Sequence, residues 1–177
     1  MNKSVTRDAY GTLIEPTTLK IQRLLPGPVE RIWAWLVESD KRRKWLAAGQ
    51  MEMKLGAPFE FVWRNDELTD PPGKRPDGFG AEHRMQSRIT ELDPPRRIAF
   101  TWSESSDVSI ELEEQGSEVL LTLIHRRLPN RDYMLRVGPG WHAHLDVLAA
   151  RARNEEPAPF WDCMTKLRGE YDRRLPQ

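Results

Sequence analysis

Four histidines are the side chains of this sequence best suited to proton transfer or metal binding. His142 and His144 form a His-x-His pair in a segment with helical spacing, where residues two apart do not face each other. His142 also precedes Asp146 by four residues, a spacing typical of an exposed pair on a helix. Because no Glu-x-x-His or Cys-x-x-Cys spacing accompanies them, we predict neither a metal site nor another cofactor.

Two histidines could act as an acid or a base on a bound molecule, because histidine titrates near neutral pH. His125 lies on a strand face shared with apolar residues, and His144 flanks an apolar helical stripe. The sequence places no carboxylate beside either ring. Cys163, on a helical stripe with Phe160 and Leu167, is expected to be a buried structural thiol. We therefore predict no catalytic residue, and the acid-base role stays an alternative.

The composition favours one cytoplasmic domain. A chain of 177 residues fits one domain, and a single cysteine excludes an intramolecular disulfide. Lys plus Arg and Asp plus Glu both number 27, so the basic excess of a nucleic-acid-binding protein is absent. No apolar stretch is long enough to cross a bilayer. We expect no nucleic-acid partner and no membrane insertion, and we interpret Lys41 to Lys44 as a solvated helix end.

The N-terminal third predicts one strand followed by two helices. Residues 1–16 are expected to form a flexible arm, so the domain spans residues 17–177. Apolar and polar residues alternate over residues 17–25, which indicates a strand. Pro28 suits the first turn of a helix. A second, short helix is expected from Ser39, which can cap it, to Leu46.

The middle of the chain predicts six strands and a long loop. Two short strands are expected at residues 51–55 and 59–64. Residues 65–80 are rich in proline and glycine and predict a loop that either covers a cavity mouth or lacks order. Alternating patterns then predict a meander with strands at residues 83–93, 97–102, 108–113 and 119–125.

The C-terminal third changes to helical spacing. Gly138-Pro139-Gly140 is interpreted as punctuation, and an apolar stripe runs from Trp141 to Ala152. Pro157-Ala158-Pro159 interrupts it, and a second stripe follows from Phe160. This order predicts an α+β fold in which a curved antiparallel sheet wraps around a long C-terminal helix.

Aromatic residues are the most informative set, because the chain has seven tryptophans. Those on the strand faces predicted to point inward would line an apolar cavity between sheet and helix, or fill the core. The predicted walls are Trp63, Met85, Phe100, Trp102, Ile110, Leu121 and Leu123, with Trp141, Leu145 and Leu148 from the helix. The polar groups predicted to orient a ligand there are Ser87, His125 and His144.

Five segments carry a resemblance to a known superfamily. They are RLLPGPVERIW (residues 23–33), RKWL (43–46), DPPRRIAFTW (93–102), GWHAHLD (140–146) and PFW (159–161). Their order and spacing resemble the START-like, or SRPBCC, helix-grip superfamily with its Bet v-like architecture. Within it, the chain resembles the branch named after the activator of the heat-shock protein 90 ATPase.

The resemblance implies an internal cavity for an apolar or amphipathic small molecule. Members of the superfamily include lipid carriers, hormone receptors, polyketide aromatase/cyclases and chaperone regulators, and a fold alone does not select among them. Our first hypothesis is a small-molecule-binding protein. The alternatives are an enzyme of the cyclase, dehydratase or hydrolase type that uses the same cavity, and an interaction module that is either a stress-linked chaperone regulator or a homodimer.

Overall fold

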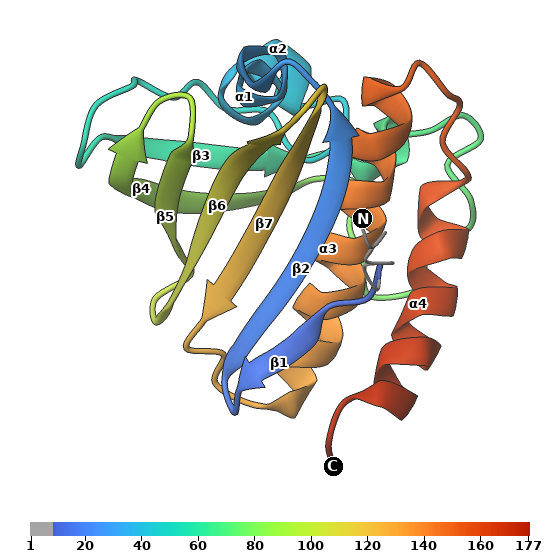
Figure 1. The fold of residues 1–177 in the computed structure, drawn as a ribbon. Coiled ribbons are helices and arrows are strands. Elements are labelled where there is room, and N and C mark those ends of the chain that lie inside the picture. Colours follow the sequence, from blue (N-terminus) through green and yellow to red (C-terminus); the bar gives the residue numbers. More distant parts are fainter. Residues whose placement is uncertain (1–8) are drawn as a thin grey trace, which may run out of the picture.

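The computed structural model of the chain describes residues 9–177. Within that range, seven strands form one antiparallel sheet, and helices cover one side of it (Figure 1). The strands are β1 (Thr12–Glu15), β2 (Thr18–Pro26), β3 (Pro58–Trp63), β4 (His83–Asp93), β5 (Arg97–Trp102), β6 (Ser106–Gln115) and β7 (Glu118–Arg126). The helices are α1 (Val29–Val37), α2 (Ser39–Arg42), the short 3₁₀ helix η1 (Asn65–Glu67), α3 (Arg131–Ala152) and α4 (Phe160–Arg174).

The sheet has the order β1-β2-β7-β6-β5-β4-β3. The meander β3 to β7 is therefore extended on the β7 side by β2 and β1 from the start of the chain. Figure 1 shows the sheet bending strongly: β2 and β7 run steeply through the view, whereas β3 and β4 run across it. α3 lies against the concave face, α4 packs beside α3, and α1 with α2 cover one end (Figure 1). The predicted α+β helix-grip arrangement is therefore confirmed.

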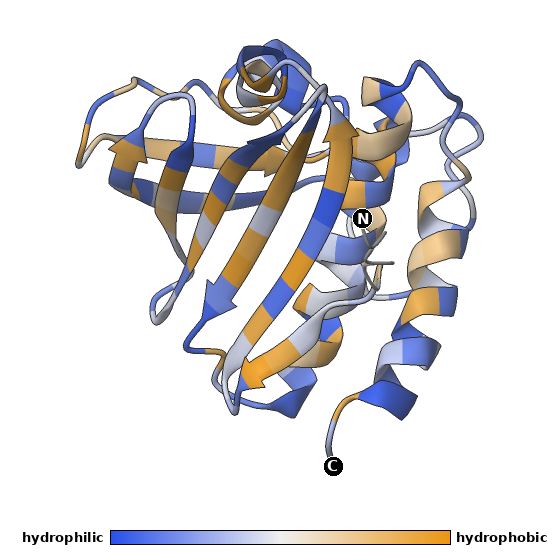
Figure 2. Cartoon of the chain, in the orientation of Figure 1, coloured by the Kyte–Doolittle hydropathy of each residue, from blue (hydrophilic) through white to orange (hydrophobic). Residues whose placement is uncertain are grey.

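Alternating hydropathy explains why the sheet has a buried face. Figure 2 shows hydrophobic and hydrophilic residues alternating along β2 and β6. In β2, for example, Leu19, Ile21 and Leu25 are almost fully buried, whereas Lys20 and Gln22 between them are partly exposed. Successive side chains of a strand point to opposite faces, so this pattern buries one face under α3. No helix of residues 9–177 is long and apolar enough to cross a membrane.

The expected strand at residues 51–55 is wrong. Met51 packs against the core, but Met53 and Leu55 are exposed, and the segment has no strand pairing. Besides β4, the described residues give β3 only an isolated bridge, from Ala48 to Val62, and the residues just before β3 bond to β4. The amide of Gly56 donates to the carbonyl of Ile89 at 2.8 Å, and the Ile89 amide donates to the next carbonyl, that of residue 57.

The arm predicted over residues 1–16 is wrong at its C-terminal end. Thr12–Glu15 forms β1, which pairs with β2 in the register Thr12 opposite Lys20. The strand is short and its burial pattern does not alternate cleanly, so its sequence carries little signal. Residues 1–8 lie outside the described residues.

Gly138-Pro139-Gly140 does not punctuate the helix, because α3 already begins at Arg131 and runs through it. The Asn130 side chain caps the helix by accepting a hydrogen bond from the Tyr133 amide at 2.9 Å. Gly138 lets α4 approach closely, because a Cβ there would lie 3.2 Å from the Tyr171 ring. The predicted interruption before Phe160 is present and separates α3 from α4.

The loop at residues 65–80 is anchored to α4. The carbonyl of Pro72 accepts a hydrogen bond from the Trp161 amide at 2.9 Å, and the Lys74 amide donates to the Asp162 carboxylate at 2.9 Å. The Phe79 ring lies 5.2 Å from the Trp161 ring. These contacts hold the loop against the N-terminal end of α4.

Candidate functional site

The predicted site residues on the strands share the concave face of the sheet. Residues opposite each other in antiparallel strands point to the same side. The register pairs Phe100 with Val108, Val108 with His125, and Ile110 with Leu123. The strand residues of the predicted site on this face are Trp63, Met85, Ser87, Phe100, Trp102, Ile110, Leu121, Leu123 and His125.

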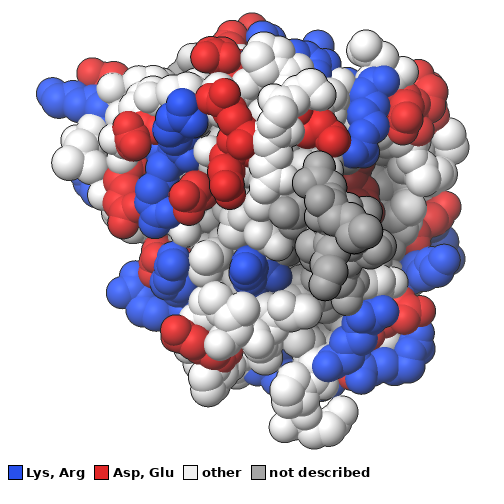
Figure 3. All heavy atoms as spheres, viewed as in Figure 1, with Lys and Arg blue, Asp and Glu red and all other residues white. Residues whose placement is uncertain are grey.

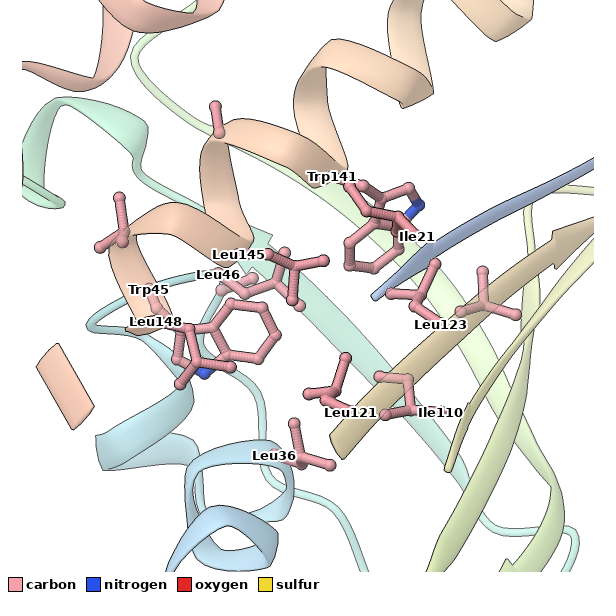
Figure 4. Packing of buried hydrophobic residues seen from close by; sticks show 14 of the residues in the cluster. Ile21, Leu36, Trp45, Leu46, Ile110, Leu121, Leu123, Trp141, Leu145 and Leu148 are labelled. Carbon is pink, nitrogen blue, oxygen red and sulfur yellow. The ribbon is translucent and has the colours of Figure 1, made fainter. Parts of the chain in front are cut away.

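Helix α3 brings three more predicted residues to this face. Figure 4 shows Trp141, Leu145 and Leu148 pointing from α3 toward the sheet, where Leu121 and Leu123 lie opposite. All five are almost fully buried. Sequence periodicity therefore placed the helical stripe on the correct side of α3.

The side chains expected to line the cavity belong to one buried hydrophobic cluster, with Met85 and Trp102 only partly buried at its margin. A void of about 10 Å³ is left inside this packing, enough for about one water molecule. Its lining comes from α1, the segment 42–51 and the sheet: Leu36, Arg42, Trp45, Leu46, Met51, Phe61, Ile98, Phe100 and Ile110. Large aromatic and aliphatic side chains fill the surrounding space. The alternation of residues along a strand predicts which face a side chain is on, but not how much space the side chains fill together.

A row of three tryptophans, Trp63, Trp102 and Trp141, crosses the concave face from the edge strand β3 to α3. The ring centroids of Trp63 and Trp102 are 5.5 Å apart, and those of Trp102 and Trp141 are 5.1 Å apart. Phe61 lies 5.1 Å from Trp63 and 5.3 Å from Phe100. Such aromatic pairs add about 0.5–1.5 kcal/mol each beyond burial. We call these three residues the tryptophan row.

His125 joins the tryptophan row through a chain of hydrogen bonds. The indole N–H of Trp141 donates to Nδ1 of His125 at 3.1 Å, so the His125 proton is on Nε2. Nε2 then donates to the Ser106 hydroxyl at 3.2 Å, and this hydroxyl donates to the Trp102 carbonyl at 2.6 Å. Every polar atom of the imidazole therefore has a partner.

Burial keeps His125 neutral. Desolvation lowers the pKa of His125 from 6.5 to about 3. A general acid or base works best when its pKa is close to the working pH. His125 thus has the properties of a neutral structural group at pH 7, and the geometry gives no support to the acid-base alternative.

The other two predicted polar groups, His144 and Ser87, have hydrogen-bond partners as well, and these are backbone carbonyls. Nδ1 of His144 donates to the Trp45 carbonyl at 2.8 Å, and its ring lies 4.8 Å from that of Phe160. Burial lowers the pKa of His144 to about 4, against the opposing effect of this hydrogen bond. The Ser87 hydroxyl donates to the Thr101 carbonyl at 2.5 Å. The structure does not bring His144 or Ser87 together with His125.

Sequence reasoning missed a second polar group at the interface of α3, α4 and β2. Nδ1 of His142 lies 3.0 Å from the Tyr171 hydroxyl, and Nε2 of His142 lies 3.3 Å from the Asp146 carboxylate. Arg23 donates to the same carboxylate at 3.0 Å. We call Tyr171, His142, Asp146 and Arg23 the Tyr171 chain.

Part of the Tyr171 chain was visible in the sequence. The four-residue spacing of His142 and Asp146 predicts an exposed pair, which is wrong for His142, 5% exposed, whereas Asp146 is exposed. Tyr171 and Arg23 come from opposite ends of the chain, so no local pattern could connect them. Burial alone would raise the pKa of Asp146, but the hydrogen bond from His142 and the charge of Arg23 outweigh it and lower that pKa.

A groove of about 480 Å³ lies outside the sheet-helix core, beside β1. Its lining combines β1, the start of α3 and the end of the described chain: Leu13, Ile14, Glu15, Pro16, Arg131, Met134, Pro176 and Gln177. Its mainly apolar lining includes Ile14, which is half exposed. The sequence does not predict this groove, because residues 13–16 belong to the expected flexible arm.

Charges and metal ligands are dispersed rather than clustered. On the face seen in Figure 3, acidic and basic side chains are intermixed. Arg96 pairs with Glu114 at 3.0 Å, for example, and Arg97 pairs with Glu91 at 2.5 Å. Among the described residues, no three His, Cys, Asp or Glu side chains come together so that they could hold a metal ion.

Comparison with known proteins assigns this fold to a family. The family model of the "Activator of Hsp90 ATPase homolog 1-like protein" matches residues 26–153, more than half of the chain. The chain belongs to this family. The match runs from the end of β2 to just beyond α3, so it includes His125 and the tryptophan row. The resemblance found in the sequence is thereby confirmed.

Several solved structures are similar to this chain. The protein encoded by gene BPP1335 from Bordetella parapertussis is 36% identical, with a TM-score of 0.80 over 96% of this chain and 92% of that one. CalU16 from Micromonospora echinospora is 22% identical, with a TM-score of 0.62 over 87% and 84% of the two chains. DynU16, a putative protein in the dynemicin biosynthetic locus, is 16% identical, with a TM-score of 0.63 over 80% and 49%. The last two similarities concern the fold alone.

Proposed function

We propose that this member of the family binds an uncharged aromatic or apolar small molecule at the tryptophan row. The observation that carries the proposal is the row itself, which forms a continuous aromatic surface between sheet and α3. Binding sites for small molecules are mostly lined by apolar and aromatic side chains with few polar groups. The row has this composition, and its nearest polar group, His125, is neutral.

Entry of a ligand requires side chains to move, because Trp63 and Trp141 are buried. Trp102, the middle member of the row, is partly exposed, as is Met85 on β4, so the row reaches the surface at Trp102. Beside Trp102, the Tyr133 hydroxyl of α3 donates to the hydroxyl of Ser103, the residue after β5, at 3.2 Å. One exposed hydrogen bond contributes about 0.5–1.5 kcal/mol, so this bond is a small barrier to opening.

Binding is favoured over turnover by the polar groups of the row. His125, Ser106 and the Trp102 carbonyl satisfy one another and leave no free donor for a reacting atom. The ligand class that fits is therefore uncharged and recognised by shape. The DynU16 structure belongs to a protein of a biosynthetic locus, and a role of this chain in handling an aromatic biosynthetic intermediate is consistent with our proposal.

The indole N–H signals of the seven tryptophans provide the test. An uncharged aromatic probe, N-phenyl-1-naphthylamine, is titrated into ¹⁵N-labelled protein and followed by NMR. We expect the signals of Trp63, Trp102 and Trp141 to shift with one saturating curve. Trp33 and Trp35 on α1 serve as internal controls and should stay unchanged.

Native mass spectrometry of freshly purified protein complements the titration by detecting a copurified ligand. A titration in which the tryptophan row does not respond would contradict the proposal. So would shifts confined to methyl groups of Leu13 and Met134, because these line the outer groove instead. The Y133F variant is expected to bind the probe faster, since it lacks the bond to Ser103.

A further inference from the structure

Residues 9–11, just before β1, lie across the Tyr171 chain and contact three of its members. Nη1 of Arg23 donates to the carbonyl of Ala9 at 2.6 Å, and the amide of Gly11 donates to the Tyr171 hydroxyl at 2.6 Å. Between them, the ring of Tyr10 lies edge-on to His142 with centroids 4.8 Å apart. We call residues 9–11 the strap. It leads directly into β1, which begins at Thr12.

The direction of the hydrogen bonds follows from which groups keep their protons. Burial raises the pKa of Tyr171 to about 12, so its hydroxyl keeps a proton that it must donate. The Tyr171 oxygen already accepts from the Gly11 amide, and Nδ1 of His142 is the ring atom within reach of its O–H. Nδ1 therefore accepts and carries no proton, while Nε2–H of His142 donates to the Asp146 carboxylate.

Protonation of His142 reverses one of these bonds. Nδ1 then becomes a donor and points its proton at the Tyr171 oxygen. That oxygen would receive two donors, from His142 and from Gly11, while its own O–H loses its acceptor in a buried position. Departure of the Gly11 amide relieves the conflict, because it frees the oxygen and lets the hydroxyl reach water.

We propose that the strap, residues 9–11, is a pH-sensitive element that neutral His142 holds closed and protonated His142 releases. Release would uncover the Tyr171 hydroxyl and the His142 ring and free the N-terminal end of β1. Of the residues involved, His142 and Asp146 lie within the part of the chain that the family model matches, whereas the strap, Arg23 and Tyr171 lie outside it. The proposal is independent of ligand binding at the tryptophan row.

Charged and titratable groups face His142 from every element around it. On α3 itself, the Asp146 carboxylate lies 3.3 Å from Nε2 of His142. On β2, Arg23 pairs with that carboxylate. On α4, Tyr171 contacts His142, and Arg174 lies 3.6 Å from the ring centre of Tyr10. Cys163, also on α4, has a raised thiol pKa, first because it is partly buried and second because the Asp146 carboxylate is near. The Cys163 thiol therefore stays neutral. From the strap, the Tyr10 ring faces His142.

The other three histidines do not explain a pH-dependent release of the strap. The pKa values of His125 and His144 are lowered to about 3 and about 4, so both rings stay neutral between pH 5 and 8. His83, the remaining histidine, is exposed on β4, at the far side of the sheet order from β1. A transition of the strap in this pH range is therefore assigned to His142, and an H83N variant is its matched control.

Amide hydrogen exchange by NMR tests the proposal on the full chain. Protection of the Gly11 amide, corrected for the intrinsic effect of pH, is measured from pH 8 to pH 5. We expect it to fall at least tenfold with a one-proton transition whose midpoint matches the titration of the His142 ring. The Leu123 amide in the central strand β7 should stay protected throughout.

Two variants separate the steps. In H142N the amide oxygen still accepts from Tyr171 but cannot take up a proton, so Gly11 should stay protected at every pH. In Y171F the acceptor of the Gly11 amide is gone, so Gly11 should be unprotected at every pH while Leu123 remains protected. H83N should behave like the wild type.

Several results would overturn the proposal. They are constant protection of Gly11 in the wild type, a transition that survives in H142N or is lost in H83N, and protection of Gly11 that persists in Y171F. Parallel loss of protection at Gly11 and Leu123 would indicate global unfolding and would also overturn it. If H142N does not fold, the coincidence of the Gly11 midpoint with the His142 titration in the wild type decides the question alone.

Discussion

Arg42 is a buried cation whose guanidinium is surrounded by backbone carbonyl oxygens. It donates to the carbonyls of Leu36 and Val37 at 3.2 Å each, to that of Ala47 at 3.1 Å, and to that of Gly49. Two of these carbonyls end α1, where a positive charge interacts favourably with the helix dipole. Burial lowers the pKa of Arg42 to about 10, so the side chain remains charged at neutral pH. The interpretation of Lys41 to Lys44 as a solvated run is therefore wrong for Arg42.

Replacing Arg42 should destabilise the fold substantially. In R42M four carbonyls lose their donor, and we expect a loss of about 2–4 kcal/mol in the free energy of unfolding. The exposed neighbour provides the control, because R43M should change that free energy by less than about 0.5 kcal/mol. Urea unfolding followed by circular dichroism measures both. Equal effects of the two variants would show that the carbonyl contacts of Arg42 contribute nothing.

At the scale of elements, α3 continues through a proline because its neighbour supplies the missing bond. Pro139 has no N–H to donate to the carbonyl four residues earlier, that of Leu135. Arg168 of α4 donates to this carbonyl instead, at a long 3.4 Å. The helix is buried against the sheet and α4, so packing retains a helical conformation that the local sequence disfavours.

Replacing Pro139 should therefore stabilise α3. P139A restores the N–H and removes the ring from the helix interior, and we expect a gain of about 1–2 kcal/mol in the free energy of unfolding. P157A, in the loop between α3 and α4, is the matched control and should be neutral or slightly destabilising, because it only adds freedom to the unfolded chain. Urea unfolding measures the difference. A P139A protein less stable than the wild type would contradict this account of α3.

At the scale of the whole molecule, two buried neutral histidines make the fold sensitive to acid. In the unfolded chain His125 and His144 have pKa values near 6.5, whereas in the folded chain they are about 3 and about 4. Above about pH 6.5 these two histidines are mainly neutral in both the folded and the unfolded chain, so they do not lower the free energy of unfolding. As the pH falls toward 4, only the unfolded state binds them, so each histidine costs about 1.4 kcal/mol per pH unit.

We therefore expect the free energy of unfolding to fall between pH 7 and pH 4.5 because of these two residues. Urea unfolding at several pH values measures the slope. H144N should reduce the slope by about half of the histidine contribution, and H83N should leave it unchanged. A wild-type stability that is flat over this range would show that the two histidines are not buried as neutral groups.

The inward face of each main strand and the apolar side of α3 could be predicted from the sequence alone. These features depend on periods of 2 and 3.6 residues, which are local properties of the chain. Trp102 and Leu123 therefore lie on the predicted face, and Trp141 lies on the predicted side of the helix. The local pattern is too short to indicate a strand in β1, and at residues 51–55 it is misleading because no partner strand pairs with that segment.

Only the tertiary structure decided what fills the concave face and what surrounds each polar group. Side chains from α1, the sheet and α3 join in one buried cluster, and their combined volume is not a property of any one segment. His142 is buried rather than exposed because Tyr171 from α4 contacts it, and Gly11 and Arg23 bond to its neighbours Tyr171 and Asp146. Periodicity decides the direction in which a side chain points, but its partners depend on long-range packing.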